Sequence, residues 1–367
     1  MPRENILTTT AARIAHIPFW LFSRRAPFAP TKALILKPCC LSQVMLATPL
    51  LTALSKAYPQ TRFDWAVSEW ARPALNGNPR LTEIIVTSPG SLHNLSWNEL
   101  YDFSQTLRQH RYDTCIIPSR SGLLSLIAWW ARIPQRIGLH ANGRGFAHTL
   151  PVKLPRTVQH EAAVYLSLAS ALGVDTEMIR GATMEFYPPD ADRTAVTQRL
   201  VNENWLGDTP LVILHPGGGT NPVQTDLSKQ WPVERFVLLA NHIIRKHKAR
   251  LVLVGAAEDT PIAKDIIGLL PVPIINLVGK LKLGELGALC EVANLYVGID
   301  TGTTHIAAAV GCPTLAIFGP TNPTISGPYA TKGKVLTLAP DEPQPTFSWE
   351  NNVTVSTACQ AADQLLT

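Results

Sequence analysis

The residues best suited to chemistry in this 367-residue chain stand in one short run near its C-terminal end. An apolar stretch at 295–299 predicts a buried strand, and it leads into Asp300-Thr301-Gly302-Thr303-Thr304-His305. Gly302 permits a tight turn, and we expect a helix to begin at about Thr303. Free backbone N–H groups at a helix start, the helix dipole and two hydroxyls favour an anion such as a diphosphate. An Asp-Thr-Gly before a helix is as often a simple N-cap, so this run alone leaves both interpretations open.

A second candidate is a glycine-rich turn after the apolar stretch 211–214. It contains Gly217, Gly218 and Thr220, and its glycines would let the backbone approach a ligand closely. It is not a dinucleotide fingerprint, because the third glycine of that pattern would fall where the chain has Pro222. A flexible loop is the alternative interpretation of these glycines.

Three charged residues stand where they would suit a nucleotide. Lys229 comes just before a helix that Pro232 opens, so it is either a charge partner for a phosphate or a solvated lysine. Glu258 and Asp259 follow the apolar stretch 251–254, at the sheet edge where open parallel sheets bind ligands. A carboxylate there could accept both hydroxyls of a ribose, or it could form an acidic first turn that complements a helix dipole.

The elements that must position these residues are predicted by apolar stretches that alternate with helical periodicity, a pattern typical of βα units and a parallel sheet. In the first series we expect strands at 33–36, 63–67, 83–86, 114–117 and 136–139. We expect helices at 44–54, 97–108, 123–131 and 160–172. After a polar helix at 190–204, a second series has expected strands at 211–214, 251–254, 274–277, 295–299 and 314–318. Two series that meet near residue 188 predict two Rossmann-like domains.

Composition indicates a globular protein. Apolar residues make up 46% of the chain, charged residues make up 16%, and the length exceeds one ordinary core. The net charge of +5 comes without a Lys/Arg block, so the sequence disfavours a nucleic-acid partner but is compatible with an anionic ligand or membrane. The six cysteines show no C-x-x-C pattern and no histidine at metal-ligand spacing. We interpret them as reduced, mostly buried thiols in a cytosolic protein, with no metal site.

Residues 1–30 form a separate leader. Apolar residues such as Phe19 and Trp20 alternate there with arginines such as Arg13 and Arg24, and this interruption argues against a signal peptide. One interpretation is an amphipathic segment that lies on an anionic membrane surface. The other is a helix packed on the first domain, or a frayed leader.

Taken together and in this order, the motifs resemble glycosyltransferase family 9, the ADP-heptose:lipopolysaccharide heptosyltransferases. The resemblance extends from about residue 33 to residue 329. In the C-terminal half it rests on His215-Pro-Gly-Gly, Ser228-Lys-Gln-Trp-Pro, the turn 255–259, Asn276-Leu-Val-Gly-Lys and the run that begins at Asp300. In the N-terminal half it rests on Leu46-Ala-Thr-Pro-Leu-Leu, Arg136-Ile-Gly and His160-Glu-Ala-Ala. The whole set of motifs in the same order indicates the family far more specifically than any single motif does.

The resemblance implies a GT-B fold, in which two Rossmann-like domains with parallel sheets face a central cleft. The acceptor-side domain would be 31–188 and the donor-binding domain 189–367, and the sequence leaves open whether the C-terminal helix returns to the first domain. The implied reaction is metal-independent transfer of a sugar, heptose in this family, with inversion and without a cofactor. ADP-heptose or a related nucleotide sugar would be the donor, and a lipopolysaccharide-like or other cell-surface glycan or glycolipid the acceptor. Such a protein would be cytoplasmic, or peripheral at the inner face of the membrane.

The resemblance also assigns roles to single residues. Lys229 would meet the donor phosphate, either Glu258 or Asp259 the ribose, and Asp300 the transferred sugar. His305 would support the diphosphate loop or face the phosphate. The remaining substrate-binding positions implied by the motifs are Gly217, Gly218, Thr220, Thr301, Gly302, Thr303 and Thr304.

One position departs from the family pattern. The first βα loop of the family reads Leu-Gly-Asp-Val, and its aspartate is the presumed base for the acceptor hydroxyl. Here the loop reads Leu41-Ser42-Gln43-Val44. A glutamine amide can orient a hydroxyl but has no basic oxygen at neutral pH, so general-base catalysis of roughly 10²–10⁴-fold is missing at this position.

Gln43 leaves two functions open. In the first, the protein is an active transferase in which Glu161 or a donor phosphate oxygen replaces the missing carboxylate. In the second, it is a family member that binds a sugar nucleotide as a sensor or scaffold and has lost catalysis. A nicotinamide-dependent oxidoreductase is disfavoured, because the glycine fingerprint fails.

Overall fold

A computed structural model of the chain describes residues 10, 26–87, 95–220, 225–340 and 347–367. The chain divides into two compact units. The first consists of the chain up to Cys39 together with Ala47–Arg72 and Asn78–Ala182, and the second of Cys40–Leu46, Pro73–Gly77 and Thr183–Thr367. Most of the predicted leader 1–30 lies outside the described residues.

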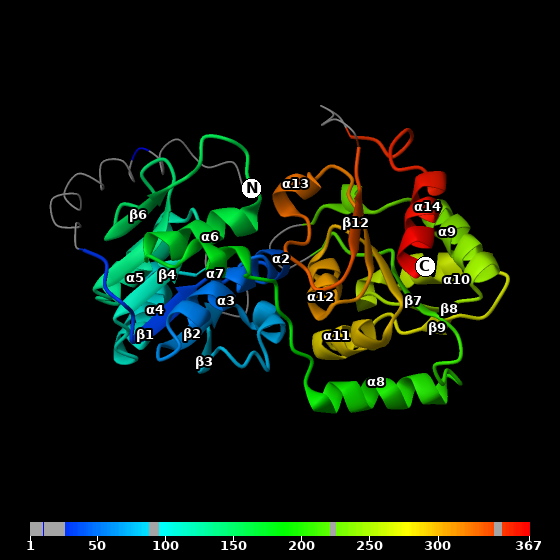
Figure 1. The fold of residues 1–367 in the computed structure, drawn as a ribbon, viewed down its shortest axis with the longest axis horizontal. Coiled ribbons are helices and arrows are strands. Elements are labelled where there is room, and N and C mark those ends of the chain that lie inside the picture. Colours follow the sequence, from blue (N-terminus) through cyan, green and yellow to red (C-terminus); the bar gives the residue numbers. More distant parts are fainter. Residues whose placement is uncertain (1–9, 11–25, 88–94, 221–224, 341–346) are drawn as a thin grey trace. The chain divides into compact units, whose positions relative to one another are not determined.

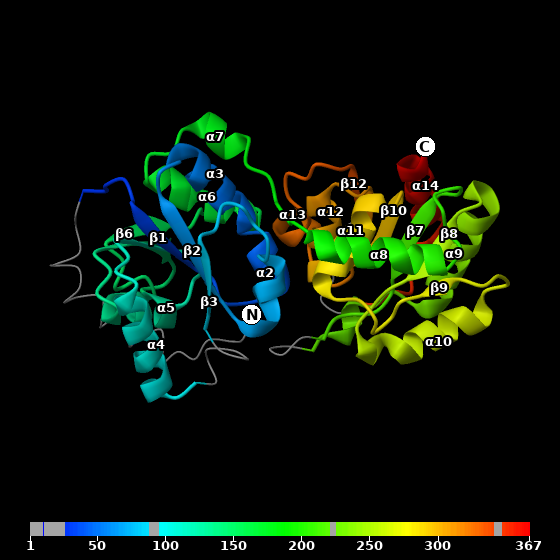
Figure 2. The same cartoon turned by 90° about the horizontal axis from the view of Figure 1, so that it is seen from below.

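A parallel sheet of six strands, in the order β3-β2-β1-β4-β5-β6, forms the centre of the first unit. Its strands are β1 (Lys32–Leu36), β2 (Arg62–Val67), β3 (Glu83–Val86), β4 (Thr114–Ile117), β5 (Gln135–His140) and β6 (Leu150–Lys153). Its helices are α3 (Thr48–Ala57), α4 (Trp97–Gln109), α5 (Gly122–Trp130), α6 (Glu161–Ala171) and α7 (Thr176–Arg180). Figure 2 shows α4 and α5 on one face of this sheet and α3, α6 and α7 on the other.

Helix α4 shows how local sequence sets these elements. It begins at a capping box, in which the Glu99 N–H donates to Ser96 Oγ at 3.3 Å and the Ser96 N–H donates to Glu99 Oε2 at 2.7 Å. Leu100, Phe103 and Leu107 recur at helical spacing and are buried against the sheet. The cap fixes where the helix begins, and the apolar stripe fixes which face is buried.

The second unit repeats the architecture with the strand order β12-β11-β10-β7-β8-β9, again with every pair parallel. Its strands are β7 (Leu211–His215), β8 (Arg250–Leu253), β9 (Ile275–Asn276), β10 (Leu295–Ile299), β11 (Thr314–Ile317) and β12 (Val335–Leu338). Its helices are α2 (Leu41–Met45), α8 (Asp190–Asn202), α9 (Val233–His247), α10 (Thr260–Leu269), α11 (Leu283–Val292), α12 (Gly302–Val310), α13 (Pro323–Ser326) and α14 (Val355–Leu366). The chain also forms short 3-10 helices η1 (Glu69–Ala74), η3 (Leu227–Lys229) and η4 (Ala257–Asp259).

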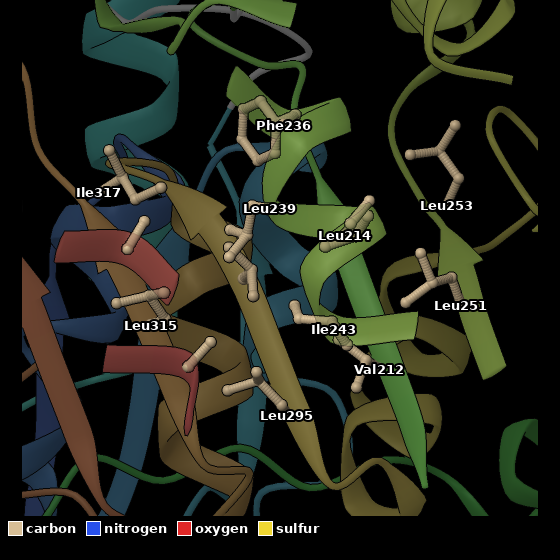
Figure 3. Close-up of a cluster of buried hydrophobic side chains, with 14 of the residues drawn as sticks. Val212, Leu214, Phe236, Leu239, Ile243, Leu251, Leu253, Leu295, Leu315 and Ile317 are labelled. Carbon is tan, nitrogen blue, oxygen red and sulfur yellow. The ribbon is translucent and has the colours of Figure 1, made fainter. Parts of the chain in front are cut away.

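The core of the second unit lies on both faces of its sheet. Figure 3 shows side chains of β7, β8, β10 and β11 gathered against Phe236, Leu239 and Ile243 of α9. Successive residues of a strand point to opposite faces, so Leu214 packs in this cluster while its neighbour Ile213 packs against α8, α11 and α12. Strands buried on both faces explain why these segments read as continuous apolar stretches.

The predicted α/β architecture with two Rossmann-like sheets is confirmed, and most predicted strands lie within a residue or two of their observed bounds. Two edge strands, β6 and β12, were not predicted. Strand β6 contains Pro151, which a sheet tolerates at an edge but which reads as a strand breaker in sequence. The helix expected at 44–54 is also divided, because α2 ends at Met45 and α3 begins at Thr48 with Pro49 in its first turn.

Two observations concern the ends of the chain and the membrane. The C-terminal helix α14, whose return to the first domain the sequence left open, packs against α9 and β11 within the second unit (Figure 1). Among the residues that the structure describes, no helix is both long and apolar enough to cross a bilayer.

Candidate functional site

Four loops of the second unit follow the carboxyl ends of β7, β8, β10 and β11, and together they carry the residues that the sequence singled out. Lys229 and Asp300 meet there, with the Lys229 ammonium 2.8 Å from Asp300 Oδ2. Thr321, which follows β11, donates a second hydrogen bond of 2.8 Å to the same oxygen. The Asp300 side chain is only 7% exposed while that of Lys229 is 22% exposed, so the cation is the more accessible partner.

The start of α12 adds backbone donors to this pair. The helix begins at Gly302, one residue before the expected position, and its N-cap Thr301 makes no side-chain capping bond. The Thr304 hydroxyl turns inward and donates to Ile299 O at 2.6 Å. Because Thr301 does not cap the first turn of α12, the backbone N–H groups of that turn meet the requirement of an anion-binding helix start.

A neutral polar network holds the start of α12 against β7. His215 Nδ1 lies 2.9 Å from the Thr303 hydroxyl and 3.0 Å from the Tyr296 hydroxyl. Burial lowers the pKa of His215, although the Asp259 carboxylate partly opposes this shift, and burial raises the pKa of Tyr296. Both groups thus stay uncharged near neutral pH, and they position Thr303 without adding charge.

The glycine-rich turn after β7 is packed and hydrogen-bonded. A Cβ on Gly217 would lie 2.1 Å from Asp259 Cγ, and Gly218 has a φ of +101°, which an L side chain rarely adopts. The Gln230 amide donates to Gly218 O at 2.8 Å, which ties this turn to the segment that carries Lys229. Trp349 donates to Ser228 O at 3.0 Å and holds that segment from the other side.

The two carboxylates after β8 differ sharply. Asp259 is buried, and its two oxygens accept hydrogen bonds from Gly218 N–H at 3.0 Å and Ala256 N–H at 2.8 Å. It therefore connects the turns after β7 and β8. Glu258 is exposed on η4, so it is the carboxylate of this pair that remains open to a ligand.

The remaining predicted residues are His305, Gln43 and Thr220. His305 is completely buried, which favours its supporting role over contact with a phosphate. Gln43 is half-buried on α2, in the segment Cys40–Leu46 that belongs to the second unit. In the same segment Leu41 packs so tightly that a Cβ on Gly302 would lie 2.4 Å from Leu41 Cγ. Thr220 is exposed and pairs in an isolated bridge with Thr225.

A different polar cluster lies in the first unit, after the ends of β1 and β4. Glu161, the predicted replacement base, is held by Arg120 through two bonds of 2.9 Å, one to each carboxylate oxygen. Lys37 is buried beside it, donates to the Tyr165 hydroxyl at 3.1 Å, and lies 4.7 Å from the centre of the Tyr165 ring. Burial lowers the pKa of Lys37 to about 7, and the Glu161 charge opposes this shift.

Several of these residues escaped sequence reasoning. Thr321 and Lys37 each follow the end of a predicted strand. Their position was therefore a signal that could have marked them as candidates, whereas their residue types gave none. Arg120 similarly follows the strand 114–117. Tyr296 carried no signal, because an aromatic residue in an apolar segment reads as core. Trp349 carried none either, because it stands in a polar stretch outside every motif.

The cysteine prediction needs a correction. Cys39 and Cys40 are disulfide-bonded, whereas the other four cysteines are free. Since the chain has six cysteines, the bond joins these two neighbours. Sequence spacing favoured reduced thiols because it gave no C-x-x-C pattern, and this rule does not consider adjacent residues. The prediction holds for Cys115, Cys290 and Cys312, which are free and buried.

Comparison with known proteins decides the family. The model of glycosyltransferase family 9 (heptosyltransferase) matches residues 100–355, which is more than half of the chain. The chain belongs to glycosyltransferase family 9. The predicted family is thereby confirmed, and with it the conclusion that this protein is a glycosyltransferase of the heptosyltransferase type.

Named relatives of family 9 span most of the chain. Lipooligosaccharide heptosyltransferase 2 of Haemophilus influenzae is 26% identical over 84% of this chain and 89% of its own length. Lipopolysaccharide heptosyltransferase 2 of Salmonella typhimurium is 27% identical over 84% and 88%.

Solved structures share the fold. A family 9 glycosyltransferase from Veillonella parvula has a TM-score of 0.80 at 22% identity, covering 93% of this chain and 99% of its own. The E. coli ADP-heptose lps heptosyltransferase II has a TM-score of 0.73 at 23% identity, covering 92% and 98%. The predicted GT-B fold class is confirmed.

Proposed function

We propose that the protein transfers a heptose from ADP-heptose to a glycan acceptor of the lipopolysaccharide core, with inversion at the transferred carbon. The single observation that carries this proposal is the meeting of Lys229, Asp300 and the uncapped start of α12 at one sheet edge. The names of the relatives supply the sugar and the acceptor class, and an E. coli heptosyltransferase of the same fold is known in complex with ADP.

The donor diphosphate would bind at the start of α12. Its negative charge would be stabilised by the backbone N–H groups of the first turn and by the ammonium of Lys229. The helix N-terminus and the ammonium would thus supply the positive charge without a metal ion. Lys229 would then be shared between the phosphate and Asp300. Because both anions favour the charged ammonium, Asp300 would hold Lys229 in place for the leaving ADP.

The ribose would be recognised by Glu258. Its carboxylate is exposed at the end of β8, whereas both oxygens of Asp259 already accept backbone hydrogen bonds. Glycines at 217 and 218 would let the nucleotide approach the backbone of this turn. Asp259 then acts on the nucleotide only by fixing the turn that contacts it.

The bond changes define what the acceptor side must do. The acceptor oxygen forms a bond to the anomeric carbon, the bond from that carbon to the diphosphate breaks, and the acceptor proton must leave. An inverting attack comes from the face opposite the diphosphate, so a donor phosphate oxygen is poorly placed to take this proton directly. Gln43 cannot take it, and both oxygens of Glu161 are already engaged by Arg120. Proton removal is therefore the slow part of the proposed reaction.

Gln43 supports a second candidate function, a protein that binds the sugar nucleotide as a sensor or scaffold without turnover. The two candidates share the donor site and differ only in transfer. A lipid-linked acceptor would in either case bring the protein to the inner face of the membrane as a peripheral protein.

The decisive experiment offers ADP-heptose and a heptose-deficient core glycolipid to the wild type, Gln43→Asp and Lys229→Met, with product detected by mass spectrometry. We expect slow transfer by the wild type and transfer by Lys229→Met that is slower by about 10²–10³-fold. Nucleotide-dependent thermal stabilisation without transfer or donor hydrolysis would establish the binding function instead. If ADP-, GDP- and UDP-sugars all fail to stabilise the protein, both candidates are wrong.

A further inference from the structure

A cluster of metal-ligating side chains lies between α9 and α14, among helices that the proposed transfer does not use. His242 and His247 stand in the last two turns of α9, and Asp363 stands in the last turn of α14. The Nε2 atoms of the two histidines lie 2.9 Å and 2.6 Å from the same oxygen, Asp363 Oδ1. All three ligand atoms lie within 4.8 Å of one another.

This convergence has the dimensions of a coordination site. A tetrahedral ion with bonds of about 2.0–2.2 Å to nitrogen and oxygen holds its ligands roughly 3.3 Å apart. The two nitrogen–oxygen distances need to lengthen by only about half an ångström to reach this value. Side-chain rotation supplies such a change without moving either helix.

The helix dipoles and the packing favour a cation with one carboxylate ligand, while the Lys246 ammonium beside Asp363 is a like charge that opposes it. The carboxyl ends of both helices point their partial negative charge toward this region. Lys246 donates to the other carboxylate oxygen, Asp363 Oδ2, at 2.8 Å, which orients Asp363 and leaves Oδ1 for the ion. Ile243 of α9 and Ala362 of α14 are buried in the same hydrophobic cluster, which holds the two helices together beside these ligands.

The three side chains are also accessible. His242, His247 and Asp363 are 31%, 13% and 21% exposed, so an ion can enter from solvent and a water can complete the coordination. Two imidazoles and one carboxylate suit Zn²⁺ and similar transition cations, whereas Mg²⁺ prefers oxygen ligands.

We propose that His242, His247 and Asp363 bind one divalent transition cation of the Zn²⁺ class, which fastens the C-terminal helix α14 to α9. The site is separate from the donor site, and its role is to stabilise the second unit. It would reverse the expectation of no metal site, which rested on the spacing of the cysteines. Asp363 is 116 residues from His247 in the chain, so sequence spacing could not reveal this set of ligands.

A second set of possible ligands in the first unit serves as the control. Asp64, Glu83 and His110 also have ligand atoms within 4.8 Å of one another. There Asp64 Oδ2 accepts a hydrogen bond of 2.8 Å from the Tyr112 hydroxyl and lies 3.8 Å from the Lys32 ammonium, and Glu83 is exposed. We expect no transition cation at this set.

The test uses full-length, untagged protein stripped with a chelator and titrated with ZnCl₂ by calorimetry and thermal unfolding. We expect one Zn²⁺ per chain, and at a hundredfold excess over Kd a rise in Tm of roughly 5–10 °C. The variants are His242→Gln and His247→Gln, because a glutamine amide can still donate to Asp363 but is a poor zinc ligand. Each should weaken Zn²⁺ binding at least tenfold, while His110→Gln should bind as the wild type does.

Each outcome decides the proposal. Because the Tm shift is measured within each variant, a change in metal-free stability does not obscure it, and circular dichroism confirms folding. Co²⁺ should give the visible absorption of a low-symmetry site in the wild type and lose it in His247→Gln. The cluster would be only a hydrogen-bonded ion group if the wild type does not bind Zn²⁺. The same conclusion would follow if both α9 variants bind Zn²⁺ as tightly as the wild type does. A shift that His110→Gln abolishes would place the metal at the other set.

Discussion

The polar groups of the two units differ in how firmly they are paired, although both groups follow strand ends of the same kind of sheet. In the second unit, Lys229 is 22% exposed and its partner Asp300 is also held by Thr321. In the first unit, Glu161 is buried and bound at both oxygens by Arg120, with Lys37 enclosed beside them. The Lys229 and Arg120 side chains are about equally exposed, at 22% and 23%, so exposure does not distinguish the two pairs. Lys229 makes a single contact with Asp300, which leaves N–H donors of its ammonium for an incoming anion, whereas Arg120 binds both oxygens of Glu161. The second unit is therefore built to receive a ligand, and the first to hold a fixed charge arrangement.

The largest effect should come from returning a base to the first βα loop. Gln43→Asp should raise the transfer rate by about 10²–10⁴-fold, because a carboxylate can take the acceptor proton. The measurement is kcat for product formation, with Gln43→Asn as the control that changes length without adding charge. Equal rates for the wild type and Gln43→Asp would mean that another group already removes this proton.

Lys229→Met should lower kcat/KM by about 10²–10³-fold, because it removes the ammonium whose positive charge would stabilise the leaving diphosphate. It should also weaken ADP binding, measured by calorimetry. Lys264→Met, at an exposed position on α10, is the matched control and should leave both quantities unchanged. If the two variants behave alike, Lys229 does not contact the donor.

Glu161→Gln tests the fixed pair of the first unit. It leaves the Arg120 guanidinium half-buried without its carboxylate, so we expect a loss of about 3 kcal/mol in the free energy of unfolding, measured in urea. The exposed pair of Arg180 and Glu177, which are 71% and 78% exposed, is the comparison, and Glu177→Gln should change stability by less than about 0.5 kcal/mol. Similar losses from both variants would remove the contrast drawn between buried and exposed pairs.

Lys37 should give the first unit a characteristic pH dependence. Its pKa is about 7 in the folded protein because of burial, against a usual value of 10.5. Between these values the unfolded chain binds a proton that the folded chain does not, so this group makes stability fall as the pH is lowered from 10.5 to 7. Comparison of the wild type with Lys37→Met by urea unfolding should show a difference that changes by up to about 1.4 kcal/mol per pH unit in this window. A pH-independent difference would show that Lys37 is charged in the folded state.

The smallest expected effect concerns Thr321. Thr321→Val removes one of the two hydrogen bonds to Asp300 Oδ2, which should cost about 1 kcal/mol and lower kcat/KM roughly fivefold. Thr197→Val on the exposed face of α8, where the hydroxyl bonds only to its own helix, is the control. A loss as large as that of Lys229→Met would mean that Thr321 itself contacts the donor.

The positions of most strands, the family and the donor-site candidates could be predicted from the amino-acid sequence alone. This was possible because apolar stretches mark strands buried on both faces, and parallel strands bring their carboxyl ends to one edge whatever the details of packing. Asp300 could therefore be placed at this edge, whereas Lys229, 71 residues away, was assigned to the donor only by the resemblance to family 9.

Which of the candidates is open to a ligand depends on contacts that form only in the folded protein. Glu258 and Asp259 are chemically similar neighbours in sequence, yet Asp259 is committed to Gly218, 41 residues away, and Glu258 is not. The pairing of Glu161 with Arg120 and the meeting of α9 with α14 were equally invisible in sequence. Spacing along the chain predicts local geometry, but a hydrogen-bond partner is chosen by which distant side chains the packed helices and strands bring within reach.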